Sequence, residues 1–499
     1  MLGVRALAAL ASIGACVALV ACEPSAPPPA LSSPPRPPPF VAPRPAPLEQ
    51  LTASLASDGS AMTYERALVD EVGVRMTGTA AFDRAVTWAK AKFAALGHDA
   101  SEESFRIDQT WERGAARGKL VGPDRPIQVR TAAWTPATPR PVTADVVRVV
   151  DLSPAGIDAA KTKLRGRAVL LDPATAFAGE FLEFNARLAD AFPALARAGV
   201  AAVLWPSRLP NDQIKAHCPM QHVGMIAPLP IFDVAASDAA EILARAERGR
   251  ARLELVSENR VGPARDVANV AWELRGRERP DEIVLVTAHL DSWDLSVGAQ
   301  DNGTGVAMVL ASARAIAALG APPRRSIRFV LFGGEEQGLR GSRAYVEAHA
   351  AELDRFVAVL NTDDGSGAPR GWQAEGRPDV EAALAPIAAR WLTGLGGGRV
   401  SRESSGNSDH TPFFAAGVPA LNLWVDGSRY PEIHHLPTDT IDRVDAGNLA
   451  KDAAIVGVTA YAVADAEERL AKRLDEGGTR ALLERERLLA PMRALGFVR

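Results

Sequence analysis

Three short apolar segments of this chain each end at residues with acidic or imidazole side chains. The segments are "EIVLVTAH" at 282–289, "SIRFVLFGG" at 326–334 and "RFVAVLNT" at 355–362. A short apolar run bounded by turn residues is typical of a buried β-strand, and the first run is followed by glycines and a helical pattern, "GVAMVLASARAIAAL". Because open α/β sheets place their ligand-binding side chains at the carboxyl ends of strands, the pattern predicts an α/β fold with a site at one sheet edge.

The residues that follow the first segment have the chemistry of a metal site. His289 ends the segment, and neutral imidazole is a good ligand for zinc. Asp291, two residues on, points the same way if the strand geometry persists, so it could hydrogen-bond the other ring nitrogen and fix the tautomer. Asp301 lies in "GAQDNGTG", where glycines allow a sharp turn before the helix. A carboxylate at that position can bridge two cations.

The adjacent acids Glu335 and Glu336 follow the second segment. Neighbouring carboxylates on a loop point in different directions, so one can bind metal while the other handles protons. Metal-assisted hydrolysis needs both functions, a Lewis acid that acidifies bound water and a carboxylate that passes the proton of this water to the leaving amine. The sequence therefore predicts a metallohydrolase, in which Asp291 and one of these two glutamates support the catalytic step.

Further candidates for a second metal lie downstream. Asp363 and Asp364 follow the third segment, and "YPEIHHLPTDT" contributes His434 and His435. With these in place, the chain resembles the zinc aminopeptidase family M28 in the order and spacing of five motifs, which are "HLDSWD", "GAQDNGTG", "EEQGLRGS", "SDHTPFFAAGVPA" and "HHLPTDT".

The resemblance implies two zinc ions and a role for each matching residue. In that family the metal ligands are a His, a bridging Asp, the second Glu of a doublet, an Asp after the next strand and a late His, and the first Glu is the general base. On this sequence, one metal would be held by His289 and Asp363 and the other by Glu336 and His435, with Asp301 bridging and Glu335 as the base.

Two of these assignments rest on a choice between neighbours. Asp363 is preferred to Asp364 because it directly follows the "VLNT" strand. His435 is preferred to His434 because it lies four residues before Asp439, as in the family pattern "HxxxDT". The other member of each doublet remains the alternative ligand.

Within the family, the chain resembles the carboxypeptidase Q branch. The likeness runs from about residue 60 to about residue 465 and includes "WERG" at 111–114 and "VGVRMTG" at 72–78. It implies a three-layer α/β catalytic domain with a mixed sheet, an inserted protease-associated (PA-like) domain that roofs the cleft, and dipeptides or short peptides with a free amino terminus as substrates. "DNGTG" and "HHLPTDT" depart from that branch, which leaves the exact substrate preference open.

The chain is expected to have six parts. These are a lipoprotein signal peptide (1–22), a Pro-rich linker (23–58), an amino-terminal helical part of the catalytic domain (59–117), the PA-like insertion (118–262), the main catalytic segment (263–465) and a charged, peripheral helical tail (466–499).

The amino-terminal segment indicates where the protein acts. "LVAC" at 19–22 follows an apolar run, which is the pattern of a bacterial lipoprotein signal cleaved to leave a lipidated Cys22. The twelve prolines in residues 24–47 predict an extended spacer. A lipid-anchored protein of the cell envelope is therefore expected, at the outer membrane because Glu23 is not the aspartate that often retains lipoproteins at the inner membrane. The alternative is an ordinary secretory signal.

Other residues and partners are less constrained by the sequence. Asp409 and His410 begin a helix beside the cleft and are candidates for substrate contact, with a supporting role as the alternative. The group His217, Cys218 and His222 is interpreted as a structural or substrate-facing loop. A formal charge of −4, with 56 basic and 60 acidic residues, gives no indication of nucleic-acid binding, and a homodimer is left open.

Three other functions are weighed against the short-peptide exopeptidase. An aminopeptidase on longer peptides differs only in the shape of the lid. A glutaminyl cyclase-like transferase uses one zinc and would not be expected to carry the roofing domain. A receptor-like binding protein without catalysis would be expected to lack the metal ligands.

Overall fold

The computed structural model describes residues 45–498, except residues 177–178, 225 and 405. The expected signal peptide, the lipidation site Cys22 and most of the Pro-rich linker lie outside the described residues. Within the part of the chain that is described, no helix is both long and apolar enough to span a membrane.

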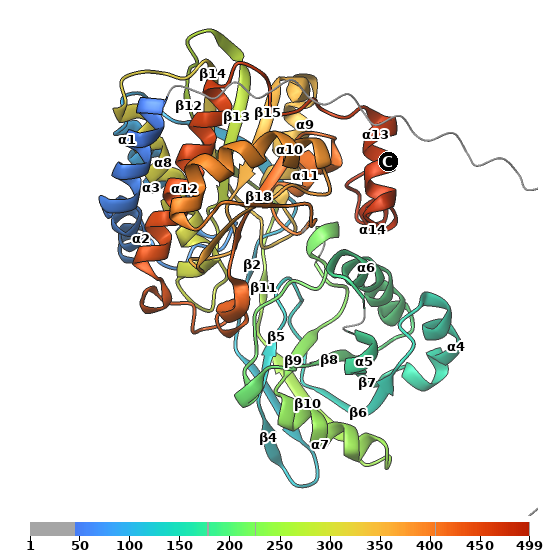
Figure 1. Ribbon diagram of the computed structural model, residues 1–499. Helices are drawn as coiled ribbons and strands as arrows, with labels where there is room; N and C mark the ends of the chain where they lie inside the picture. Colours follow the sequence, from blue (N-terminus) through green and yellow to red (C-terminus); the bar gives the residue numbers. More distant parts are fainter. Residues whose placement is uncertain (1–44, 177–178, 225, 405, 499) are drawn as a thin grey trace, which may run out of the picture. The chain divides into compact units, whose positions relative to one another are not determined.

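The first of two large sheets is mixed and carries the three predicted strands at its centre. Its strand order is β1-β12-β14-β13-β15-β18-β16-β17, and the pairs β14–β13, β13–β15 and β15–β18 are parallel. Four parallel strands therefore end at the same edge of this sheet (Figure 1). The strands are β1 (Ser101–Ile107), β12 (Arg265–Leu274), β13 (Arg279–His289), β14 (Arg325–Phe332), β15 (Phe356–Asn361), β16 (Pro369–Gln373), β17 (Arg399–Ser401) and β18 (Ala420–Val425).

Helices cover both faces of the first sheet, which makes three layers. Along β13, Val284 and Val286 pack into one apolar core, while Ile283 and Leu285 pack into another, as the two-residue period of a strand requires. One face is covered by α1 (Pro45–Ser57), α2 (Ser60–Glu71), α3 (Ala80–Ala94), α8 (Thr304–Ala318), α10 (Pro378–Ile387) and α12 (Ala446–Asp465). The other is covered by α9 (Arg340–Ala348), α11 (Thr411–Ala415), α13 (Glu476–Arg485) and α14 (Leu489–Ala494).

The second sheet is built from one continuous insertion between β1 and β12. Its strand order is β4-β3-β10-β6-β7-β8-β9-β5, with β6 to β9 parallel. The strands are β3 (Ala116–Leu120), β4 (Arg125–Ile127), β5 (Val129–Thr131), β6 (Val142–Val149), β7 (Ala168–Leu171), β8 (Ala202–Pro206), β9 (Ile231–Val234) and β10 (Arg252–Ser257), and the helices are α4 (Pro154–Leu164), α5 (Pro173–Ala176), α6 (Phe181–Arg197) and α7 (Ala236–Ala246).

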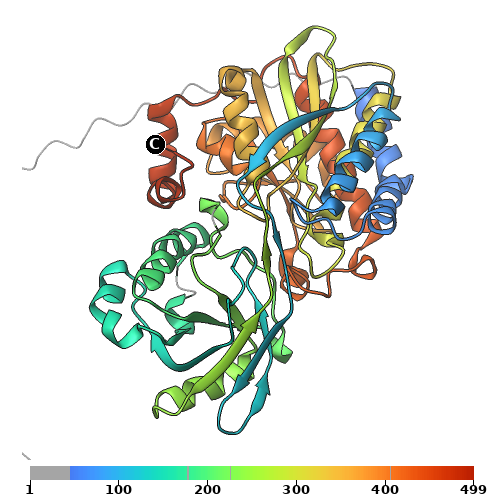
Figure 2. The same ribbon diagram turned by 180° about the vertical axis from the view of Figure 1, so that it is seen from behind.

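The chain leaves and re-enters the first sheet through paired segments. The short strands β2 (Trp111–Glu112) and β11 (Arg260–Val261) pair antiparallel, as do β1 with β12 and β3 with β10. Figure 2 shows these two connecting segments running side by side. The second sheet thus spans Ala116 to Ser257.

Short 3-10 and π turns complete the described chain. They are η1 (Pro210–Asp212), η2 (Gln221–Val223), η3 (Ala299–Gly303), η4 (Ala350–Arg355), η5 (Ala388–Leu392), η6 (Thr393–Leu395), η7 (Gly427–Glu432) and η8 (Ile441–Arg443).

Two expectations for the ends of the chain are wrong. Residues 45–57, assigned to the linker, form α1, because the prolines occupy its first turn, where they are tolerated, and Leu48, Leu51 and Leu55 are buried in the core. The charged tail is helical as expected but not peripheral, since Leu482 and Met492 are buried against the first sheet's second face.

Candidate metal centre

The predicted ligand residues meet at the carboxyl edge of the first sheet. His289 is the last residue of β13, Glu335 and Glu336 follow β14, and Asp363 follows β15. These three strands are parallel neighbours, so the loops after them come together. Asp301 joins them from the turn η3 that precedes α8.

Hydrogen bonding fixes how His289 faces the site. Its Nδ1–H donates to the backbone carbonyl oxygen of Asp291 at 3.1 Å, while the Asp291 carboxylate is farther away, at 3.6 Å. A carbonyl oxygen can only accept, so the proton of the neutral ring sits on Nδ1 and the Nε2 lone pair is free to bind a metal. Asp291 therefore orients the ring as expected, but mainly through its backbone.

The Nε2 atom of His289 points at two carboxylates. It lies 2.9 Å from Oδ1 of Asp363 and 3.2 Å from Oδ1 of Asp301. Although burial disfavours the charged ring, Asp363 and the hydrogen bonds to Asp291 and Asp301 raise the pKa of His289 well above its usual value. The surroundings of His289 therefore strongly stabilise a positive charge at this position.

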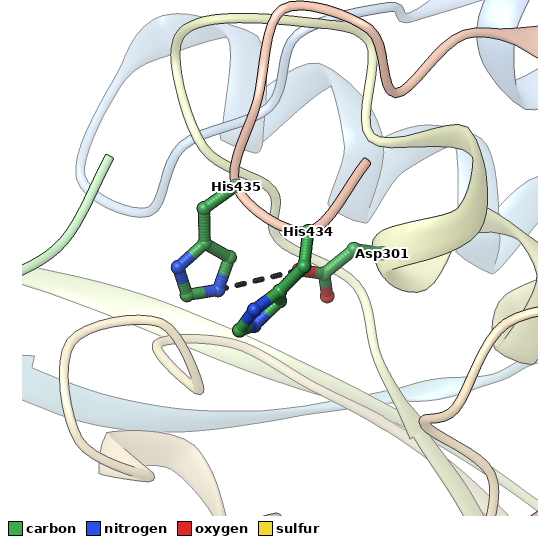
Figure 3. Close-up of side chains that lie close together, drawn as sticks. All are labelled: Asp301, His434 and His435. Atoms are coloured by element: carbon green, nitrogen blue, oxygen red, sulfur yellow. Dashed lines mark ion pairs between the residues drawn. The ribbon is translucent and has the colours of Figure 1, made fainter. Parts of the chain in front are cut away.

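His435 is oriented in the same way by a residue of the insertion. Its Nδ1–H donates to the carbonyl oxygen of Ala216 at 3.0 Å, and the Ala216 N–H donates to the His435 carbonyl oxygen at 2.8 Å. Its Nε2 lies 3.3 Å from Oδ2 of Asp301 and 3.2 Å from Oε2 of Glu336. Figure 3 shows the His435 ring directed at Asp301. Burial lowers the pKa of His435 well below its usual value, so the ring is neutral.

The two carboxylate oxygens of Asp301 thus face two separate sets of possible metal ligands. Oδ1 belongs with His289 and Asp363, and Oδ2 belongs with His435 and Glu336. Oδ2 of Asp301 and Oε1 of Glu336 are buried without a hydrogen-bond partner among the described residues. Such atoms are costly unless a cation or water satisfies them. Two imidazoles and three carboxylates are ligands that suit zinc.

The acidic residues of the site repel one another when no cation is present. Burial and the nearby Asp301 raise the pKa of Glu336 well above its usual value, and burial raises that of Glu335 likewise. Burial also raises the pKa of Asp363. A bound divalent cation would stabilise the ionised form of each of these carboxylates.

The turn that carries Asp301 is held by two residues whose role sequence reasoning missed. The Asp439 carboxylate accepts the backbone N–H groups of Gln300 at 2.7 Å and Asp301 at 3.1 Å. Arg75, fully buried, donates to carbonyl oxygens of the loop between His289 and Asp301. Asp439 lies in the motif "HHLPTDT" and Arg75 in "VGVRMTG", and these positions within motifs were the available signal.

The other members of the two doublets have different surroundings. Oδ2 of Asp364 accepts a hydrogen bond from Nδ2 of Asn422 at 2.9 Å. The His434 ring stacks on Tyr430, with centroids 5.1 Å apart, but it also lies close enough to Asp301 to share a cation with it. The geometry therefore separates Asp363 from Asp364 more clearly than it separates the two histidines. Figure 3 shows both histidine rings close to Asp301.

Asp409 and His410 do not reach the cleft. Both are fully buried, and neither is among the residues that line the pocket described below. His410 Nε2 lies 3.3 Å from Oε1 of the buried Glu375, and no side chain caps the start of α11. Their burial away from the pocket favours the supporting role, the alternative to substrate contact.

A pocket of about 780 Å³ opens onto the candidate metal ligands. One wall holds Asp301, Glu335, Glu336 and Asp363, and the opposite wall comes from the insertion, with apolar side chains from α6 and β8 such as Phe184, Leu188 and Trp205. His217, Cys218 and His222 also line it. Burial raises the pKa of the Cys218 thiol to about 12, so it is not a nucleophile.

Comparisons with known proteins agree with this geometry. Residues 269–460 match the family model described as Peptidase family M28. Carboxypeptidase Q of Xenopus laevis is 29% identical over 431 residues, which is 83% of this chain and 89% of that protein. The crystal structure of a Peptidase M28 precursor from Shewanella amazonensis SB2B matches with a TM-score of 0.74 and 27% identity, covering 86% of this chain and 98% of that one.

A more distant structure shares the fold. BSAP, a zinc aminopeptidase from Bacillus subtilis, matches with a TM-score of 0.63 and 22% identity over 83% of this chain and 98% of its own. The expected α/β fold with mixed sheets is confirmed.

Proposed function

Because this chain belongs to peptidase family M28 and is a metallopeptidase, we propose that it is a binuclear zinc exopeptidase for dipeptides or short peptides with a free amino terminus. The observation that carries the proposal is the pair of histidine Nε2 atoms facing the two oxygens of Asp301. This arrangement offers two adjacent cation positions that share one carboxylate. A single-zinc transferase would need only one of them.

We assign the ligands from these contacts. One zinc would be held by His289 and Asp363 and the other by His435 and Glu336, with Asp301 shared. Two nitrogen and three carboxylate ligands leave room on each ion for water and substrate. Asp364 and His434 would support their neighbours rather than bind metal.

The zinc ions would supply Lewis acidity, which lowers the pKa of bound water and polarises the peptide carbonyl. Glu335 lines the pocket next to the ligand Glu336, so it can take the proton of the attacking water and deliver it to the leaving amine. The Asp291 carboxylate accepts the Glu335 backbone N–H at 3.3 Å, which ties the base to the loop that orients His289.

We further propose that the insertion is a PA-like lid that limits substrate length. It supplies the apolar wall of the pocket, and its residue Ala216 bonds His435 directly. A longer peptide would have to pass this wall, whereas a dipeptide fits within the pocket.

A metal-exchange experiment tests the proposal. Chelator-treated protein is reloaded with zinc, and hydrolysis of a dipeptide is compared with hydrolysis of its N-acetylated form. We expect about two zinc ions per chain, activity that returns with zinc, and cleavage of the free dipeptide alone. Full activity of the metal-free protein, or equal cleavage of the acetylated peptide, would contradict the proposal.

A further inference from the structure

The insertion places one lysine in the pocket at a fixed position relative to the metal-binding residues. Lys215 lines the pocket and directly precedes Ala216. Two hydrogen bonds tie this loop to the proposed metal site: the Ala216 N–H donates to the His435 carbonyl oxygen at 2.8 Å, and the His435 Nδ1–H donates to the Ala216 carbonyl oxygen at 3.0 Å. The backbone of Lys215 is therefore held in place, and only its side chain has freedom.

The charge on Lys215 is not balanced by a close partner. Among the described residues, no carboxylate oxygen lies within the 4.0 Å of an ion pair with its Nζ atom. Asp233, the carboxylate that acts on it most strongly, has its Oδ1 engaged with Nε2 of His217 at 2.6 Å. Burial lowers the pKa of Lys215, so an anion bound beside the ammonium would be stabilising.

The acidic residues across the pocket would not balance the charge of Lys215 in the proposed enzyme. Asp301 and Glu336 act on Lys215 electrostatically, but both are proposed metal ligands whose charge would be offset by divalent cations. The lysine then remains as a cation beside the apolar side chains of a pocket wall that also carries Arg208 and Asp233. Such a group fits a ligand that carries its own carboxylate.

We propose that the Lys215 ammonium binds the free C-terminal carboxylate of a dipeptide substrate. This inference rests on the proposed function and names the residue that selects the substrate length. In a dipeptide, only the amide nitrogen and one α-carbon separate the reacting carbonyl carbon from the carboxylate carbon. Each further residue moves the carboxylate away by about 3.3–3.6 Å. A cation beside the metal site can therefore bind the C-terminal carboxylate of a dipeptide, but it does not reach the C-terminal carboxylate of a longer peptide.

The test compares a dipeptide with its C-terminal amide, which differs only in the charged group. Wild-type enzyme should show a kcat/KM that is about 10- to 100-fold higher for the acid than for the amide, the ratio expected from one hydrogen bond to a charged group. In Lys215→Met this ratio should fall to near one. Lys215→Arg, which keeps the charge, should retain a clear preference for the acid.

Binding and a matched control separate recognition from folding. Lys163→Met replaces an exposed lysine of α4 in the same inserted domain, and it should keep the wild-type ratio. Calorimetric binding of the dipeptide to zinc-loaded Glu335→Gln protein should weaken about 10- to 100-fold when Lys215→Met is added, with zinc content unchanged.

Two results would overturn the inference, and they are distinguishable. If zinc-loaded wild type cleaves both substrates but Lys215→Met leaves the ratio unchanged, the role of Lys215 is wrong and the peptidase assignment stands. If zinc-loaded wild type cleaves neither substrate, the proposed function fails, and the inference fails with it.

Discussion

The buried guanidinium of Arg75 offers a quantitative test of how the metal-binding loop is held. Its Nε donates to the Leu290 carbonyl oxygen at 2.6 Å, and its Nη atoms donate to the carbonyl oxygens of Val297 and, at 2.8 Å, of Gly298. A fourth bond reaches the Gly73 carbonyl oxygen at 3.3 Å. Arg75→Met keeps most of the side-chain volume but leaves these carbonyls without their donor.

The expected cost follows from this geometry. A hydrogen bond to a charged group contributes about 1.5–3 kcal/mol, but the buried charge also has a desolvation cost, so the contributions do not simply add. Removing one partner of a buried ionic network typically costs about 3–5 kcal/mol. We therefore expect Arg75→Met to lower the free energy of unfolding by about 3–5 kcal/mol, and to weaken zinc binding about 10- to 100-fold.

Urea unfolding and zinc titration against a competing chelator measure the two effects. The matched control is Arg106→Met, because the ion pair of Arg106 with Asp266 is 61% and 66% exposed and should contribute less than about 1 kcal/mol. A loss below about 1 kcal/mol in Arg75→Met, or the same loss in both variants, would refute the view that this arginine holds the loop.

Two further predictions concern histidines. His435→Gln should lose about one of two zinc ions per chain and nearly all peptidase activity, whereas His434→Gln should keep both ions, as judged by metal analysis; the reverse pattern would exchange the two assignments. Far from the metal site, the hydrogen bond to Glu103 at 3.0 Å outweighs burial and raises the pKa of His349. Its contribution to stability should therefore be full below about pH 6.5, the unfolded value, and disappear as the pH rises through the higher folded pKa. His349→Gln should accordingly destabilise the protein more at pH 5.5 than at pH 9 in urea unfolding, and an equal effect at both pH values would contradict this reading.

The convergence of the proposed ligand residues could be predicted because local patterns determine their positions. His289 and Glu336 lie at or just after apolar runs, and the carboxyl ends of parallel strands must meet at one edge of the sheet. The sequence separated His434 from His435 only through the family spacing "HxxxDT", since the directions of adjacent loop residues depend on backbone angles. His435 has a left-handed φ of 60°, which no sequence pattern predicted.

Other features depend on contacts that leave no local signal. Ala216 orients His435 through its backbone alone, so its side chain carries no information about this role. The polar strand β1 has only two buried residues, Phe105 and Ile107, and sequence analysis did not predict it. The helix α1 was missed because proline-rich composition outweighed the spacing of Leu48, Leu51 and Leu55.

The central claim is that Glu335 moves protons while its neighbour Glu336 holds metal. Measuring zinc content and dipeptide turnover together in Glu335→Gln tests this most directly, because the amide keeps the shape of the side chain and cannot accept the proton. We predict wild-type zinc content of about two ions and a kcat lowered by about 10²- to 10⁴-fold. Full turnover with zinc bound, or loss of zinc from this variant, would contradict the account.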